Sequence, residues 1–170
     1  SKNSKIRERN KDRMIQLNLP PYEHHLHQED ESMLIFDSIR RRYVALTPEE
    51  WVRQHFVHYL TDVLGYPADL IRNEAQLRID RRRKRCDTVV YDTNLRPIVL
   101  CEYKAPTVSL TQKTMDQILC YNFIFRVPLL LLSNGLQHAA CLVDYEQSGY
   151  VFLPEIPSYE ELTTIIQSNQ

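Results

Sequence analysis

A chain of 170 residues is long enough for one domain with a substantial hydrophobic core and too short to favour two. Hydrophobic residues make up 43% and charged residues 25% of it, values of a folded globular protein that exclude a disordered chain. The formal net charge of -1 excludes a general attraction to nucleic acid, so polyanion binding would have to come from local clusters.

The N-terminal part carries no recognisable targeting signal. It is basic and polar, and the apolar run at residues 127–132 is far shorter than the roughly 18 residues of a membrane span. We therefore expect a cytoplasmic protein that contacts no membrane. Because residues 1–33 show neither helix nor strand periodicity, we expect a flexible or irregular N-terminal segment followed by a single domain at 34–170.

The first strong helix signal is the sequence TPEE at residues 47–50. Thr47 can cap the helix, Pro48 suits its first position, and Glu50 can reach back in a capping box. The helix is expected to end at Gly65 and Pro67. An apolar stripe at helical spacing follows the cap, consisting of Val52, Phe56, Leu60 and Val63.

Glu49 is predicted to be the acid of this helix that points inward. It lies three residues before Val52 and so projects from the apolar stripe, whereas Glu50, occupied in the cap, faces elsewhere. An acid at the mouth of the core has either a functional role or the simpler one of a first-turn carboxylate that favours the helix dipole.

Three strands are predicted next. From Asn73 onward, Ala75, Leu77 and Ile79 alternate with polar residues, which is typical of a half-buried strand. Residues 86–91 and 97–104 form two more, joined by a turn at 93–96. The basic run RIDRRRKR at 78–85 is either a solvated turn and strand end or a cluster that contacts phosphates.

The hairpin geometry brings two carboxylates together. If Asp92 and Pro97 flank a four-residue turn, paired positions sum to 189 (92 + 97), and Asp87 lies opposite Glu102. Lys104, two residues on, points to the same face. Facing carboxylates repel unless a cation or a proton lies between them, and Mg²⁺, bound through one or two carboxylates and water, fits such a pair.

Lys104 is then placed to orient or deprotonate a water molecule, or to stabilise a phosphate that gains negative charge. This combination predicts phosphodiester hydrolysis. A structural ion pair among the same side chains is the alternative.

A strand Asp followed, after a hairpin, by Glu-x-Lys resembles the signature of the PD-(D/E)XK nuclease superfamily. Here it reads Cys86-Asp87 and Glu102-Tyr103-Lys104, with Cys where the superfamily has Pro. The segment 46–67, the hairpin ending in CEYKAP, the helix that follows it and the run LLLLSNG together resemble the N-terminal nuclease domain family of type I restriction enzyme R subunits, over about residues 34–157. The resemblance implies an α/β fold: a restriction-endonuclease-like core with a mixed central sheet flanked by helices.

The resemblance also implies roles for individual residues. Asp87 and Glu102 become the metal ligands, Lys104 the catalytic lysine and Glu49 a further acid near the metal. Gln117 and Tyr121 match a Q-x-x-x-Y element associated with nuclease function; without the resemblance they would be the polar edge of a packed helix. The basic residues placed to contact DNA phosphates beside the site are Arg81, Arg82, Arg83, Lys84 and Arg85.

The resulting hypothesis is a DNA endonuclease of restriction-enzyme type that uses Mg²⁺, or Mn²⁺ in its place, and works with DNA and with other restriction-modification subunits. No GxxxxGK[ST] phosphate loop occurs in these 170 residues, so no ATP-driven motor is expected. The alternative is a non-catalytic DNA- or protein-binding module of the same fold in a larger assembly. Beyond the core, strands are expected near 138–143 and 150–153, and a final helix near 158–167.

Overall fold

The computed structural model describes residues 2–170. Residues 2–13, 26–29 and 32–33 have regular structure, residues 14–25 are irregular as predicted, and residue 1 lies outside the described residues. The predicted domain start at residue 34 falls inside a strand. Alternation did not reveal the first strand because three of its four residues are exposed and its neighbour supplies its hydrogen bonds. The elements are helix α1 (Lys2–Arg13) and an antiparallel sheet of β1 (Leu26–Glu29), β2 (Ser32–Asp37) and β3 (Arg42–Ala45).

Helix α2 (Pro48–His58) begins as predicted, with the Thr47 hydroxyl accepting a hydrogen bond from the Glu50 N–H at 3.0 Å. It continues as a π-helical turn, η1 (Tyr59–Val63), which is wider than an α-turn and shifts the rotation of the chain. Val63 is therefore 59% exposed and does not extend the buried stripe, which was the expectation. A short 3₁₀ turn, η2 (Ala68–Leu70), leads into the large sheet.

The large sheet has six strands in the order β4-β5-β6-β7-β8-β9. Only β6 and β7 are parallel, and helix α3 (Gln112–Phe125) forms the crossover between them. The sheet is therefore mixed, as predicted, and the last strands and the final helix α4 (Tyr159–Ser168) lie close to their predicted ranges. The strands are β4 (Ile71–Ile79), β5 (Arg82–Tyr91), β6 (Pro97–Tyr103), β7 (Leu129–Ser133), β8 (His138–Asp144) and β9 (Gly149–Leu153).

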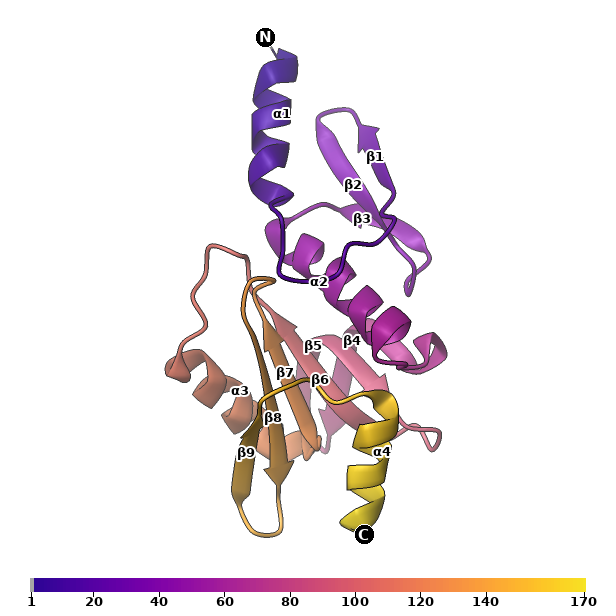
Figure 1. Ribbon diagram of the computed structural model, residues 1–170, viewed down its shortest axis with the longest axis vertical. Helices are drawn as coiled ribbons and strands as arrows, with labels where there is room; N and C mark the ends of the chain where they lie inside the picture. Colours follow the sequence, from indigo (N-terminus) through magenta and orange to yellow (C-terminus); the bar gives the residue numbers. More distant parts are fainter. Residues whose placement is uncertain (1) are drawn as a thin grey trace.

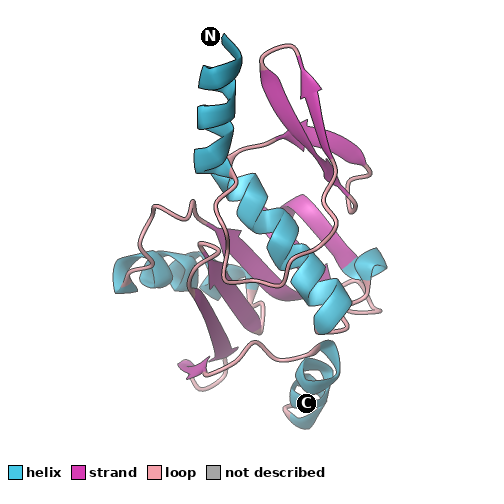
Figure 2. Ribbon diagram, turned by 45° about the horizontal axis from the view of Figure 1, so that its top comes forward, coloured by secondary structure: helices cyan, strands magenta, loops and turns pink. Residues whose placement is uncertain are grey.

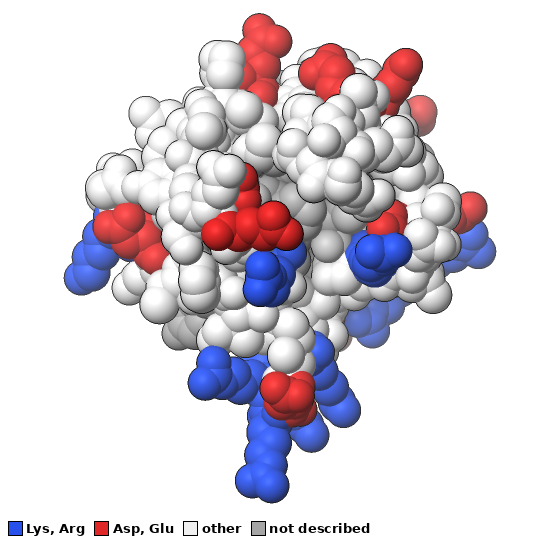
Figure 3. Space-filling model, turned by 90° about the horizontal axis from the view of Figure 1, so that it is seen from below, with Lys and Arg blue, Asp and Glu red and all other residues white. Residues whose placement is uncertain are grey.

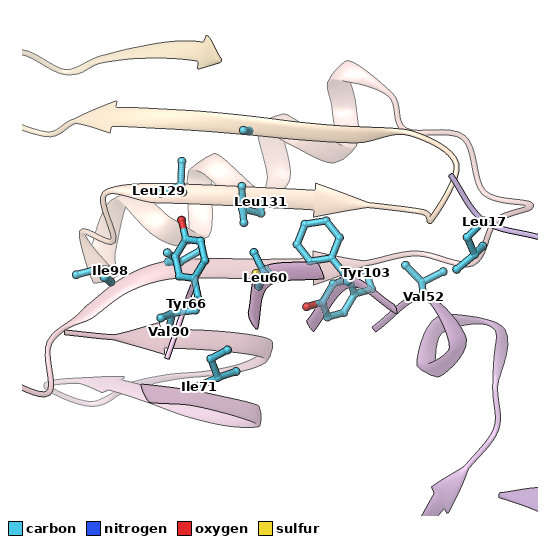
Figure 4. Packing of buried hydrophobic residues seen from close by; sticks show 14 of the residues in the cluster. Leu17, Val52, Leu60, Tyr66, Ile71, Val90, Ile98, Tyr103, Leu129 and Leu131 are labelled. Atoms are coloured by element: carbon cyan, nitrogen blue, oxygen red, sulfur yellow. The ribbon is translucent and has the colours of Figure 1, made fainter. Parts of the chain in front are cut away.

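Helices cover both faces of the large sheet. Val52 of α2 and Leu60 of η1 pack with Leu162 of α4 against one face, and Figure 4 shows Val52 and Leu60 beside Tyr103 and Leu131 of the sheet. Helix α3 packs on the other face through Met115, Ile118 and Phe125. Because both faces are covered, β6 and β7 are apolar on both sides.

Helix α1 and the small sheet lie together at one end of the molecule, with α2 between them and the large sheet (Figures 1 and 2). The segment after α1 and the small sheet join the core that α2 forms, because Leu17 and Ile35 are buried in it. Within the described residues, no helix has the length and apolar character needed to traverse a lipid bilayer.

Candidate active site

The register of the β5–β6 hairpin is the predicted one at the end that carries the candidate site. Thr88 pairs with Cys101, so paired positions sum to 189 (88 + 101). Near the turn the prediction is off by one residue, because Tyr91, not Asp92, pairs with Pro97. A bulge between Val90 and Tyr91 absorbs the difference.

Asp87 and Glu102 lie side by side one step beyond the last paired residues. The Asp87 Oδ2 atom accepts a hydrogen bond from the Tyr103 N–H at 2.8 Å, which fixes this carboxylate across the hairpin. Burial first, and then the negative charge of Asp87 and a hydrogen bond to its carboxyl group, raise the pKa of Glu102 to about 7, while Lys84 opposes the shift. The pair therefore holds two negative charges at neutral pH only if a positive group compensates them.

Strands β4 and β5 exchange faces at the level of this pair. Glu74 has a φ of +57°, in the left-handed region, and interrupts the ladder without changing its register. On one side of the interruption Ile71 and Val90 pack in the core under α2, and on the other side Leu77 and Cys86 pack in the core under α3. In regular strands Ile71 and Leu77 would share a face, since they are separated by an even number of residues.

This exchange of faces directs Lys84 toward Glu102. Lys84 lies two residues before Cys86, and Glu102 neighbours Leu132, which belongs to the same core under α3. The Lys84 Nζ atom is 3.2 Å from Glu102 Oε1, and the two side chains are only 15% and 17% exposed. The structure thus makes Lys84 an internal ion-pair partner, whereas the prediction had grouped it with the arginines that contact DNA phosphates.

Lys104 was predicted to supply the ammonium group beside the carboxylates. It follows the last residue of β6, its side chain is exposed, and its main-chain N–H donates to the Ser133 carbonyl at 2.9 Å. Among the described residues it forms no ion pair with a carboxylate. The ammonium that contacts Glu102 is that of Lys84.

Glu50, not Glu49, is the buried acid of α2, so both predicted directions are wrong. Glu50 is 7% exposed and its carboxylate contacts Arg40 at 2.6 Å and Arg53 at 2.9 Å, whereas Glu49 is exposed at the rim. The Glu50 side chain turns toward these arginines and leaves the other half of the capping box unformed. The helical spacing of the apolar stripe could not predict the direction of Glu50, because its partner Arg40 comes from the loop after β2.

Arg53 connects α2 to the large sheet. Its guanidinium donates to the carbonyl of Asp87 and to the carboxylate of Glu74, and Glu74 also contacts Arg85 at 2.5 Å. Although burial alone would raise it, Arg53 and Arg85 hold the pKa of Glu74 below its usual range. Alternation had placed Glu74 on the solvent side, and the buried Arg53 that it contacts lies between Val52 and Phe56 of the predicted apolar stripe.

A cavity of about 420 Å³ opens between the small sheet, α2 and the β4–β5 pair. Asp87 and Tyr103 lie in its wall, and Glu49 lines it from the first turn of α2. Glu49 is thus near Asp87 although it does not point into the core. The remaining charged residues of the wall are Arg40, Glu50, Arg53, Glu74 and Arg85.

Helix α3 carries the other two predicted site residues. Gln117 is exposed, on a helix that turns Met115 and Ile118 toward the sheet. Tyr121 belongs to α3, but its side chain lies outside the described part of the structure. The prediction for this pair therefore stays a prediction.

The basic run divides into two parts. Arg81, Arg82 and Arg83 are exposed in the β4–β5 hairpin, whereas Lys84 and Arg85 are held by Glu102 and Glu74. Figure 3 shows lysine and arginine side chains gathered on one side of the face in view, with most acidic side chains elsewhere. For the exposed part of the run, contact with DNA phosphates stays a prediction.

The donor set suits a hard cation that needs few protein ligands. Across residues 2–170, no group of three or more His, Cys, Asp or Glu side chains is arranged to hold a metal ion. Mg²⁺ commonly takes one or two carboxylates and keeps water in its other positions. The Glu102 Oε1 atom is buried, and the Lys84 ammonium lies 3.2 Å from it. Asp87 and Glu102 therefore fit as ligands.

The family described as the type I restriction enzyme R protein N terminus matches residues 48–157. No protein of curated function matches the chain. A solved fragment described as an HsdR subunit of a type I restriction enzyme from Vibrio vulnificus YJ016 has a similar fold, with a TM-score of 0.52 and 19% sequence identity over 71% of this chain. The chain spans 25% of the length of that fragment.

Proposed function

The chain belongs to the family of type I restriction enzyme R protein N-terminal regions, and on that premise we propose that it hydrolyses phosphodiester bonds of DNA with Mg²⁺ held by Asp87 and Glu102. The observation that carries the proposal is the carboxylate pair itself. The two side chains come from neighbouring strands, lie close enough to hydrogen bond, and raise the pKa of Glu102 to about 7 through burial and mutual repulsion. Such a pair is costly in a fold unless it binds a cation.

Each residue of the pair has a defined task in this proposal. The Tyr103 N–H holds Asp87 in place, and the β5–β6 ladder brings Glu102 beside it. Bound Mg²⁺ supplies Lewis acidity toward a phosphate oxygen. The surrounding core limits the water around Glu102 and so strengthens its interaction with a cation.

Lys104 and the exposed arginines act on the nucleic acid. Lys104 lies at the end of β6, where its exposed ammonium can reach a phosphate and stabilise charge that develops on it. Arg81, Arg82 and Arg83 contact the backbone on either side of the scissile bond without reading sequence. Other restriction-modification subunits are the partners that this family implies.

The test is cleavage of plasmid DNA by the purified chain with Mg²⁺ or Mn²⁺. We expect nicking or cutting that requires the metal, a fall of at least about 100-fold in Asp87→Asn and Glu102→Gln, and a comparable fall in Lys104→Ala. Exposed residues of the same types serve as controls: Glu146→Gln in the β8–β9 turn and Lys5→Ala in α1 should cleave like the wild type. Equal activity in all variants would reveal a contaminating nuclease.

One observation favours a second candidate, a non-catalytic DNA- or protein-binding module. The ammonium of Lys84 already compensates Glu102, and among the described residues the exposed Lys104 forms no ion pair with a carboxylate. This candidate predicts DNA binding, or retention of a partner subunit, that is the same in wild type and Asp87→Asn, together with no cleavage by either. Measuring binding and cleavage on the same preparations separates the two candidates.

A further inference from the structure

One side chain in the candidate site has no role in the function proposed above. Lys84 brings a positive charge to 3.2 Å from Glu102 Oε1, in surroundings where both side chains are largely buried. A buried ammonium and a buried carboxylate attract each other far more strongly than an exposed pair. Lys84 therefore compensates the negative charge of Glu102, as a bound cation would.

The position of Lys84 is built into the strands. The exchange of faces at Glu74 turns the half of β5 that precedes Asp87 toward α3, and this brings Lys84 to the side of the sheet where Glu102 lies. Without the left-handed residue, a residue at this position would face the opposite side. The neighbouring Arg85 is held by Glu74, so the two successive basic residues are directed to two different carboxylates.

A metal ion and the Lys84 ammonium cannot both contact the same Glu102 oxygen without strong repulsion. We propose that Lys84 is an internal competitor for the metal: it pairs with Glu102 in the metal-free protein and is displaced from Glu102 when a divalent cation binds to Asp87 and Glu102. This inference rests on the proposed function for the existence of the metal site. It adds that the site is held in a compensated, low-affinity state and that metal binding releases a lysine.

The length of the lysine side chain makes displacement feasible. Its four methylene groups let the ammonium swing away while the strand stays in place. The exposed residues Arg81, Arg82 and Arg83 lie directly before it on the hairpin, on the side where phosphates are expected. The released ammonium therefore moves toward the predicted path of the nucleic acid.

The first test compares Mn²⁺ affinity at pH 8, by calorimetry, in the wild type, Lys84→Met and Lys84→Arg. Methionine keeps most of the length and removes the charge, so affinity should rise about tenfold or more; arginine keeps the charge and should leave affinity near the wild-type value. Lys5→Met, a charge change on the exposed side of α1, should have no effect. Circular dichroism shows whether each variant is folded.

The second test uses only the wild-type protein, so it does not depend on whether a variant folds. Acetylation of lysines by an N-hydroxysuccinimide ester of acetic acid is followed by mass spectrometry with and without Mn²⁺. Labelling of Lys84 should rise severalfold with the metal, while labelling of Lys5 stays constant.

The outcomes distinguish the two proposals. Equal Mn²⁺ affinity in wild type and Lys84→Met, with binding lost in Asp87→Asn, would overturn the competitor role and leave the metal site standing. Unchanged Lys84 labelling at saturating Mn²⁺ would do the same. Absence of binding in the wild type and in folded Lys84→Met would overturn both.

Discussion

The carboxylate of Asp87 accepts a hydrogen bond at 2.8 Å from the main-chain N–H of Tyr103, on the strand that carries Glu102. This bond ties β5 to β6 beyond the last residues of their ladder. It places the negative charge of Asp87 where it repels that of Glu102, and burial strengthens the repulsion.

The first prediction concerns this repulsion. Asp87→Asn keeps a side-chain acceptor for the Tyr103 N–H but removes the charge, so the pKa of Glu102 should fall from about 7 toward its ordinary value. Carbon-13 NMR of the glutamate carboxyl groups during a pH titration measures it. An unchanged pKa would show that burial alone causes the shift.

Metal binding should depend steeply on pH. Below about pH 7 the Glu102 carboxyl is protonated in the free protein, and a cation must displace that proton. Mn²⁺ affinity should therefore fall roughly tenfold per unit as the pH drops below 7 and level off above it. Calorimetry at several pH values tests this, and a flat profile from pH 6 to 8 would contradict the role of Glu102.

Stability without metal should fall as the pH rises through the same range. Burial and the charge of Asp87 raise the folded-state pKa of Glu102 above the ordinary value of 4.5, so the folded protein binds more protons than the unfolded chain between about pH 4.5 and 7. Under this linkage the group's contribution decreases with increasing pH. Relative to that of Glu102→Gln, the free energy of unfolding of the wild type should fall by on the order of 2 kcal/mol as the pH rises across this window. Urea unfolding at several pH values measures it.

Arg53 should be a major determinant of stability. It is 6% exposed and compensates Glu50 and Glu74 while donating to the Asp87 carbonyl. Arg53→Met leaves these carboxylates without their shared partner, so the free energy of unfolding should drop by about 3–5 kcal/mol. Arg82→Met, on the exposed hairpin, should change it by no more than about 0.5 kcal/mol. A similar decrease in the free energy of unfolding in both variants would show that the buried ion pairs of Arg53 do not stabilise the fold.

The exposed arginines should govern DNA affinity. Replacing Arg81, Arg82 and Arg83 together by Gln should weaken binding to unrelated DNA sequences alike, and should lower the slope of log affinity against log salt by up to about 3. A charge-matched control replaces three exposed basic residues of α1, namely Lys2, Lys5 and Arg9. Fluorescence anisotropy at several salt concentrations gives the slope. A greater loss of DNA affinity in the α1 control than in the arginine variant would show that DNA binds at α1 and not at the hairpin.

Local patterns predicted much of this fold. The Thr47 cap, the register that brings Asp87 beside Glu102, and the closing strands and helix all follow from short-range periodicity and turn chemistry. The mixed sheet followed from the family resemblance. Periodicity and turn residues were sufficient to predict these elements because residues close together in the sequence determine them.

The errors at Lys84 and Glu74 share one physical cause. The left-handed φ of Glu74 interrupts strict alternation, and a glutamate, unlike a glycine or an asparagine, gives no sign of that conformation in the sequence. Lys84 and Glu74 consequently point to faces that alternation does not give them. Glu50 turns inward because Arg40, from outside its helix, reaches it, and contacts between distant segments are not encoded in the spacing around either residue.

The most direct test of the metal site is a calorimetric titration of the wild type and Asp87→Ala with Mg²⁺ and Mn²⁺. We predict binding to the wild type that is lost in Asp87→Ala while circular dichroism shows the variant folded. Equal binding to both proteins, or binding to neither, would contradict a metal site at Asp87 and Glu102.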